Sequence, residues 1–184
     1  MQNEPRRGLL GVTESEYEEV DLSDDLAWLK LRLGKFVKGG TYLVAGQPGI
    51  GKSTLGIQLA LDLGRRGART VYILTEQSSE DLARRAKLMS SAWRKEDAER
   101  ARASIDAEES VYDVEALPSF LAHQVLSPAG RYNGVSFIVV DSVQGHGLAA
   151  AATSKYKQVY EFCRQCKSAG ITVLLGACRR TQIL

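Results

Sequence analysis

The sequence predicts an α/β protein in which helices cover both faces of a mainly parallel central sheet, giving three layers. Two observations lead to this class. Short apolar runs alternate along the chain with longer helical patterns, as in successive βα units. Each short run is apolar throughout rather than at every second residue, which is typical of strands buried under helices on both faces.

The elements are expected in a definite order along the chain. Strands are predicted at residues 41–45, 70–75, 135–140 and 171–176, with the segment SVYDV at 110–114 as a further candidate. Helices are predicted at residues 53–66, 79–102, 116–126 and 156–168, the first closed by Gly67 and the last by Gly170. The small-residue tract GHGLAAAATS, residues 145–154, forms either a mobile loop or a backward extension of the last helix.

Length and composition are those of a folded globular protein. The 184 residues, 44% of them hydrophobic and 25% charged, suit one domain with a sizeable apolar core. Residues 1–25 carry eight acids against Arg6 and Arg7, a charge of −6, so the other residues carry +8 and the net charge is +2. No apolar run approaches the roughly 20 residues of a membrane helix, and we expect a cytoplasmic protein without a membrane partner.

A phosphate-binding loop is predicted between the first strand and the first helix, where GQPGIGKS fits the pattern G-x-x-x-x-G-K-[ST]. Its glycines let backbone N–H groups point inward, and the helix that follows adds the positive end of its dipole. Such a cradle suits a nucleoside triphosphate. The expected binding residues are Gly46, Gln47, Pro48, Gly49, Ile50, Gly51, Lys52, Ser53 and Thr54.

Four side chains are expected to carry chemistry at this loop. Lys52 would reach the β- and γ-phosphates, and the Ser53 hydroxyl would coordinate Mg²⁺. A second Mg²⁺ ligand is expected at the end of an apolar strand, where VSFIVVDS supplies Asp141, unless that residue only caps the strand. Glu76, after the next strand, would activate water or instead cap the following helix. Because parallel strands end at one edge of a sheet, these residues are predicted to converge.

Five segments resemble the RecA-like ATPases, and within them the branch of bacterial RadA (Sms) and KaiC. They are LGKFVKGG, GQPGIGKSTLGIQLA, VYILTEQSSEDLARRAKLM, VSFIVVDSVQ and AGITVLLGA, between residues 33 and 180. VYILTEQS is similar to the segment in which that family places its catalytic glutamate, which again points to Glu76. The resemblance implies a RecA-type core that uses ATP and Mg²⁺, forms homo-oligomeric rings or filaments, and is stimulated by single-stranded DNA in recombination or repair.

The resemblance also implies where DNA would bind. RecA-like proteins meet DNA through the loops after the strand that ends at Asp141 and after the final strand. Here these loops are residues 145–157 and the tail from Cys178. The candidate DNA contacts in them are Lys155, Lys157, Arg179 and Arg180, each of which is otherwise a solvated surface charge.

Two local features depart from the RadA pattern. No cysteine precedes Cys163, so the four-cysteine zinc motif of RadA is missing and an acidic segment takes its place. RecA-like enzymes usually sense the γ-phosphate with a polar residue at the end of the fourth core strand, where this chain has Ala177 and Cys178. Gln144 or Gln182 would have to substitute.

We expect an acidic N-terminal segment at residues 1–32 and a RecA-like core at 33–184 that is incomplete at its C-terminus. The chain is then either a fragment or a short relative that completes its sheet by pairing between subunits, since strand 41–45 would otherwise be an unpaired edge. The leading functional hypothesis is a Mg²⁺-dependent ATPase acting on single-stranded DNA. The alternative is a KaiC-like or accessory ATP-binding switch with little turnover and no DNA dependence.

Overall fold

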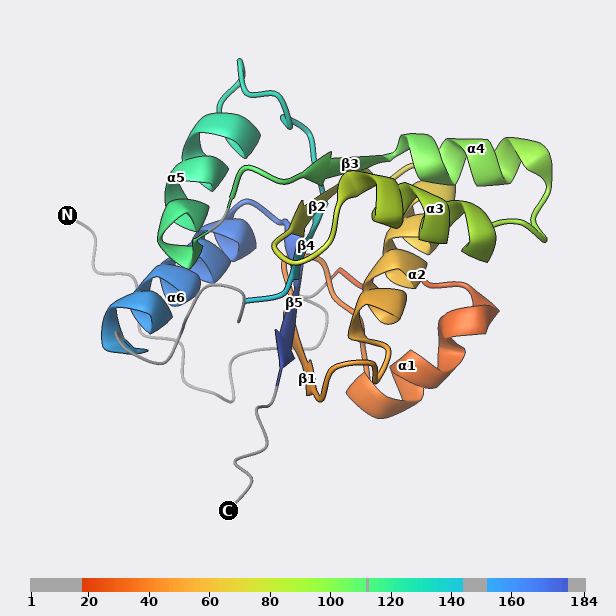
Figure 1. Cartoon of the computed structure of the whole chain (residues 1–184), viewed down its shortest axis with the longest axis horizontal. Coiled ribbons are helices and arrows are strands. Elements are labelled where there is room, and N and C mark those ends of the chain that lie inside the picture. Colours follow the sequence, from red (N-terminus) through yellow and green to blue (C-terminus); the bar gives the residue numbers. More distant parts are fainter. Residues whose placement is uncertain (1–17, 112, 144–151, 179–184) are drawn as a thin grey trace.

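A five-stranded parallel sheet forms the centre of the computed structural model, which describes residues 18–111, 113–143 and 152–178. All paired neighbours run parallel, in the spatial order β1-β5-β4-β2-β3, so the strands end at the same edge of the sheet (Figure 1). This confirms the predicted sheet. The strands are β1 (Thr41–Gly46), β2 (Thr70–Leu74), β3 (Ile105–Glu108), β4 (Phe137–Asp141) and β5 (Thr172–Cys178).

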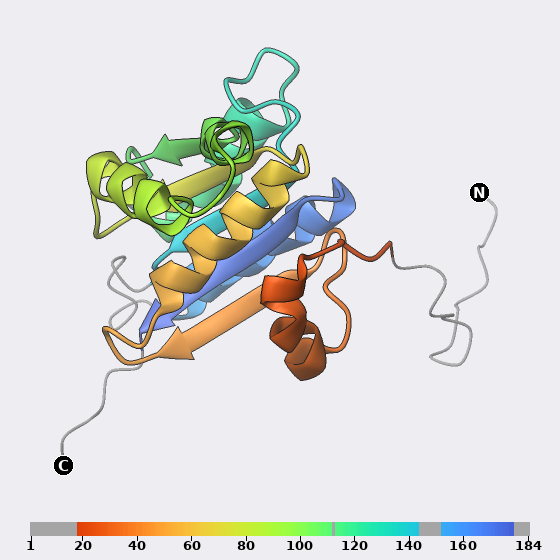
Figure 2. The same cartoon turned by 90° about the vertical axis from the view of Figure 1, so that its right-hand side faces the viewer.

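Helices cover both faces of the sheet and complete the predicted three layers. Figure 2 looks onto the face covered by α2. This face carries η3 (Asp24–Leu26), α1 (Ala27–Leu33), α2 (Lys52–Arg65), α3 (Ser79–Met89) and α4 (Lys95–Ala103). The other face carries η4 (Val114–Ala116), α5 (Leu117–Phe120), the π-helical turn η5 (Leu121–Val125) and α6 (Ala152–Ser168). Within the described ranges, no helix is both long and apolar enough to cross a membrane.

Each face of the sheet has its own apolar core. Successive residues of β2 point to opposite cores: Tyr72 packs with Ile57 on the α2 side, and Ile73 packs with Phe162 on the α6 side. All four side chains are 0% exposed. Burial of each contributes roughly 1.5–3 kcal/mol relative to exposure. A strand that is buried on both sides needs apolar residues at every position, which explains the continuous apolar runs in the sequence.

The described part of the acidic N-terminal segment packs onto the α2 face. Leu22, Leu26 and Leu29 are buried in that core. The backbone N–H of Ser23 donates to a carboxylate oxygen of Asp62 in α2, at 3.0 Å. The segment from residue 18 to α1 is therefore anchored to the helix that follows the phosphate loop.

Two predicted elements are wrong. The fifth strand is β3 at Ile105–Glu108, not residues 110–114. Val111 and Val114 are buried under the other face instead, as part of its core. The single helix predicted at 79–102 is two helices, since α3 ends at Met89 and α4 begins at Lys95, with a non-helical turn between them.

Two further elements differ in detail. The segment predicted as a helix at 116–126 is helical but passes from a 3₁₀ turn through α5 to a π-helical turn. The last helix begins at Ala152 rather than at residue 156, so the alternative of a backward extension is correct to that point. Residues 145–151 lie outside the described part of the chain.

Candidate phosphate-binding site

The glycine-rich motif forms an exposed turn between β1 and α2. Gly49 and Gly51 have φ values of 82° and 102°, a left-handed conformation that residues with a Cβ adopt only under strain. Gly51 is the N-cap of α2 and has no side chain to occupy the first N–H groups of the helix. These N–H groups, with the helix dipole behind them, favour an anion at the mouth of the turn.

The Lys52 side chain closes back over this turn. Its Nζ donates to the carbonyl oxygens of Gly46 and Gln47, each at 3.0 Å. It also lies 3.6 Å from Sγ of Cys178, at the end of the neighbouring strand β5. Neutral carbonyls hold an ammonium less strongly than phosphate oxygens do. The contacts therefore keep the Lys52 charge at the anion site and leave it free to exchange partners.

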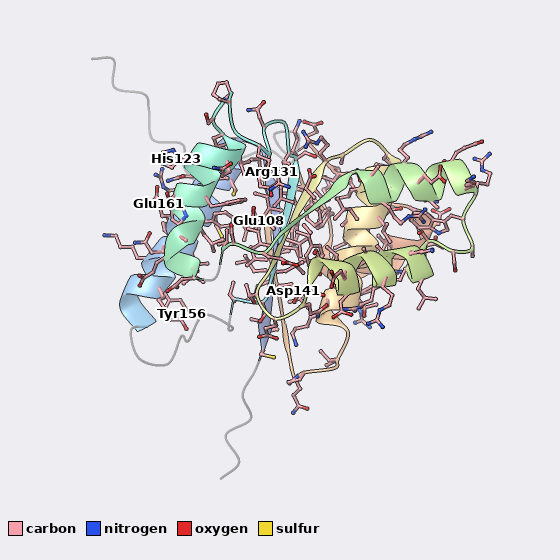
Figure 3. All side chains as sticks on the ribbon, turned by 45° about the horizontal axis from the view of Figure 1, so that its top comes forward. Glu108, His123, Arg131, Asp141, Tyr156 and Glu161 are labelled. Atoms are coloured by element: carbon pink, nitrogen blue, oxygen red, sulfur yellow. The ribbon has the colours of Figure 1, made fainter. Side chains whose placement is uncertain are left out.

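The Asp141 carboxylate lies buried at the end of β4, where Figure 3 labels it. Its Oδ2 accepts a hydrogen bond from the Tyr72 hydroxyl at 3.0 Å, and the same hydroxyl lies 3.3 Å from the carbonyl oxygen of Ser53. Burial, together with the nearby Asp141 charge, raises the pKa of Tyr72 well above its ordinary value, so Tyr72 stays a donor. A Cβ at Gly56 would come within 2.8 Å of this hydroxyl, so only glycine leaves room for it.

Asp141 does not cap its strand by bonding backbone N–H groups. Among the described residues, Tyr72 is its one hydrogen-bond donor, and Oδ1 has none. Gly176 on β5 faces Oδ1: a Cβ there would lie 3.2 Å from this oxygen. Asp141 thus presents one oxygen to the sheet edge with space beside it, which fits a ligand to a cation.

The Ser53 hydroxyl is held by two residues that the sequence analysis did not single out. Nε2 of Gln77 donates to Ser53 Oγ at 3.2 Å. Oε1 of Gln77 accepts from Arg85 Nη1 at 2.9 Å, and Arg85 Nη2 donates to Thr54 Oγ1 at 3.0 Å. Thr54 therefore contacts α3 through Arg85. No periodic pattern marks these contacts, because they join α3 to α2 across the sheet edge.

Glu76 lies two residues before the N-cap of α3 and faces the end of β4. The residue that caps α3 is Ser78, whose hydroxyl accepts from the N–H of Asp81 at 3.2 Å. The exposed Glu76 side chain instead accepts from Ser142 Oγ at 3.2 Å. The neighbouring Thr75 hydroxyl bonds to the carbonyl of Ser142 at 2.9 Å, which ties the two strand ends together. Glu76 and Asp141 are thus brought to the same edge.

The candidate DNA contacts are placed unevenly. Lys155 has a side chain only 14% exposed and lies 3.9 Å from Asp113 Oδ1. Lys157 is exposed on α6. Arg179 and Arg180 lie outside the described residues, as do Gln144 and Gln182, the candidate substitutes for the phosphate sensor.

The described residues contain no group of three or more His, Cys, Asp and Glu side chains suited to a metal ion. The pair Ser53 and Asp141 is the kind of sparse oxygen set that suits Mg²⁺, which keeps several waters and takes further oxygens from phosphates. Both side chains are oriented by donors from β2 and the segment after it, namely Tyr72 and Gln77. The residues present therefore fit a Mg²⁺–nucleotide site.

Together, the parallel sheet, the glycine turn on α2 and the aspartate at the end of β4 define a phosphate-loop nucleotide-binding protein with a RecA-like fold. Comparison with known proteins is more specific. A family profile described as "ATPase: KaiC" matches residues 23–182, and the chain belongs to this KaiC-type ATPase family. The resemblance inferred from the sequence is confirmed.

Curated relatives and a solved structure agree with this assignment. DNA repair protein RadA of Brucella abortus (strain 2308) is 32% identical over 111 residues, 60% of this chain and 21% of RadA. RadA of Helicobacter pylori (strain J99) is 38% identical over 79 residues, 42% of this chain and 18% of RadA. The crystal structure of the RadB recombinase superposes with a TM-score of 0.59, over 84% of this chain and 70% of that one, and its 20% identity shows the fold alone. The matched region spans only about a fifth of the RadA proteins.

Proposed function

We propose that this chain binds ATP with Mg²⁺ and hydrolyses it, as a RecA/RadA-like ATPase of DNA recombination or repair in the cytoplasm. The observation that carries the proposal is Oδ1 of Asp141, beside the phosphate loop, which has no hydrogen-bond donor among the described residues. This oxygen is not one of the fully buried side-chain atoms that lack a partner, so it is open to solvent and to a ligand. A cation held there with the triphosphate would use it as a ligand.

Each residue of the site then has a distinct role. The N–H groups around Gly51 and the Lys52 ammonium bind phosphate oxygens and neutralise charge that develops during transfer to water. Ser53 and Asp141 hold Mg²⁺, which when bound supplies charge neutralisation at the phosphate oxygens. Glu76 accepts the proton of the attacking water, and its contact with Ser142 sets the carboxylate at the edge where Asp141 also lies.

The relatives are the reason for including DNA binding and self-assembly in the proposal. The curated relatives are named DNA repair proteins, and the solved neighbour is named a recombinase. Lys157 on α6, with Lys155, Arg179 and Arg180, would supply sequence-independent phosphate contacts to single-stranded DNA. A homo-oligomeric ring or filament would place ATP between subunits.

The alternative is a switch that binds ATP with little turnover and no DNA dependence. One observation favours it: Cys178, beside Lys52, stands where RecA-like enzymes usually carry a polar phosphate sensor. A thiol is a weak hydrogen-bonding group. Sensing the γ-phosphate would then depend on another residue.

The deciding experiment measures steady-state ATP hydrolysis with and without single-stranded DNA, beside binding of a fluorescent ATP analogue. Wild type is compared with Lys52→Ala, Glu76→Gln and the control Glu80→Gln, an exposed carboxylate on α3. The proposal expects Lys52→Ala to lose binding, Glu76→Gln to bind without turnover, and Glu80→Gln to match wild type. Binding with negligible turnover in the presence of DNA would instead support the switch, and no binding at all would reject both.

A further inference from the structure

The contacts around the Ser53 hydroxyl form a chain that begins on α3. Arg85 donates through Nη1 to Gln77, and Gln77 donates to Ser53. Through its other terminal nitrogen, Arg85 also donates to Thr54, the residue after Ser53. No ion pair with a described carboxylate competes for Arg85, so its guanidinium is committed to these two contacts. Gln77 and Arg85 have no role in the functions proposed above.

The order of donors and acceptors in this chain is fixed by the chemistry of arginine. A guanidinium has five N–H donors and no acceptor, so the Gln77 group that faces Arg85 must be the carbonyl oxygen. The amide NH₂ of Gln77 must then face Ser53. Without Arg85, the Gln77 amide could turn over and present its carbonyl oxygen to the Ser53 hydroxyl instead.

This order decides what the Ser53 hydroxyl can offer a ligand. When Gln77 donates, Ser53 Oγ uses one of its two acceptor sites and keeps the other for a cation, while its proton stays free for a phosphate oxygen. If Gln77 presented its carbonyl, Ser53 would turn its proton toward Gln77, and the orientation that directs an acceptor site of Oγ at a cation would be lost. In addition, a hydroxyl group that no partner holds in place loses orientational freedom when it binds a cation. Gln77 fixes the Ser53 hydroxyl beforehand.

We infer that Gln77, oriented by Arg85, is a positioning residue that holds the Ser53 hydroxyl ready for a divalent cation. The inference rests on the Mg²⁺–nucleotide site proposed above and deepens it.

The test separates binding of the cation from binding of the nucleotide. Affinity for a fluorescent ATP analogue is measured in EDTA and then across a Mg²⁺ titration, for wild type, Gln77→Leu, Arg85→Met and Arg85→Lys. Arg84→Met is the matched control, since that side chain is 78% exposed and pairs with Asp81 on its own helix. Melting curves without nucleotide identify any variant that does not fold.

For Gln77→Leu and Arg85→Met we expect affinity in EDTA within about twofold of wild type and a Mg²⁺ midpoint raised about fivefold or more. Arg85→Lys, which keeps a donor but not the fork, should restore part of the shift. Because Arg85 acts through Gln77, adding Arg85→Met to Gln77→Leu should raise the midpoint no further.

Two results would overturn the inference while leaving the proposed function intact. One is an unchanged Mg²⁺ midpoint in folded Gln77→Leu and Arg85→Met. The other is an equal loss of affinity in EDTA and in Mg²⁺, which would make the two residues merely structural. Wild-type protein that binds no nucleotide at any Mg²⁺ concentration would instead reject the proposed function itself.

Discussion

Two buried carboxylates at the same edge of the sheet differ in how completely they are paired. Glu108, at the end of β3, accepts from the Tyr132 hydroxyl through Oε2 at 2.8 Å, and from the N–H and hydroxyl of Ser110 through Oε1. Asp141, at the end of β4, accepts only from Tyr72 among the described residues. They are 9% and 8% exposed, so burial alone does not distinguish them.

This difference is the reason for proposing Asp141, rather than Glu108, as a ligand to a cation. Both are held by a tyrosine, but Glu108 has a donor on each oxygen, whereas Asp141 keeps Oδ1 beside the space left by Gly176. Their side chains also belong to opposite faces, since Tyr72 lies in the α2 core and Tyr132 in the core under α5 and α6. Only the α2 face carries the phosphate loop. We therefore interpret Glu108, paired on both oxygens, as a structural carboxylate and Asp141 as the proposed functional one.

The first prediction removes the charge of each carboxylate in turn. Asp141→Asn should weaken Mg²⁺-supported nucleotide binding about a hundredfold, about 2.7 kcal/mol, because a neutral amide is a poor cation ligand. Glu108→Gln should leave nucleotide affinity within about twofold of wild type. Titration of a fluorescent ATP analogue in Mg²⁺ measures both. Equal losses in the two variants would mean that the open oxygen of Asp141 has no special role.

The second prediction concerns stability without nucleotide. Tyr72→Phe removes the one described donor to Asp141 and should lower the free energy of unfolding by about 2 kcal/mol, while Tyr132→Phe leaves Glu108 its two bonds from Ser110 and should cost about 1 kcal/mol. Unfolding in urea measures both free energies and shows which substitution costs more. Tyr160→Phe is the control, because Tyr160 is 71% exposed. The reverse order would contradict the account of which carboxylate depends more on its tyrosine.

Local sequence patterns predict only part of this contrast between Asp141 and Glu108. The strands and the phosphate loop could be predicted, because continuous apolar runs and a fixed glycine spacing are local signals. Asp141 and Glu76 could be proposed for the same reason, since each follows such a run. The strand at Ile105–Glu108 was missed because it is short, lies at the sheet edge and carries Asp106 and Glu108 in place of an apolar run.

The supporting residues could not be predicted, since their roles come from contacts between distant segments. Tyr72 reads as one more apolar strand position, and its hydroxyl matters only because it meets Asp141. Gln77 and Arg85 belong to a polar turn and a charged helix, and nothing in their spacing indicates Ser53 and Thr54 as partners. One feature of the sequence could have indicated a special role for Tyr72. It is a tyrosine within a continuous apolar strand, and a helix of the same sequence carries a glycine, Gly56, that leaves room for its hydroxyl.

The third prediction uses pH to test the hydrogen bond from Tyr132 to Glu108. Burial, the hydrogen bond to Glu108 and its charge raise the pKa of Tyr132 from 10.0 to about 12, so the stability that Tyr132 contributes is complete below pH 10 and is lost as pH rises toward 12. Burial works to raise the pKa of Glu108, but bonds from Ser110 and Tyr132 lower it below 4.5, so the stability from Glu108 is lost only as pH falls below that value.

The difference in unfolding free energy between wild type and Tyr132→Phe should therefore stay constant between about pH 6 and 9, shrink above pH 10 and be lost by about pH 11. Chemical unfolding at each pH measures it. Tyr160→Phe should show no such trend. A difference that persists undiminished above pH 11 would show that Tyr132 does not donate to Glu108 in solution.

The last prediction concerns a single atom, Oδ1 of Asp141. A Cβ at residue 176 would lie 3.2 Å from Asp141 Oδ1 and 3.4 Å from the carbonyl oxygen of Val140, a close but tolerable fit in a strand. Gly176→Ala should weaken Mg²⁺-supported nucleotide binding by about threefold, under 1 kcal/mol, and leave affinity in EDTA and the urea midpoint nearly unchanged. Because the added methyl group touches the open oxygen of Asp141 and not its bond to Tyr72, a loss confined to Mg²⁺ would locate the cation at Oδ1. An equal loss in EDTA would mean that the methyl group disturbs the loop beside it, and the open oxygen would no longer explain the site.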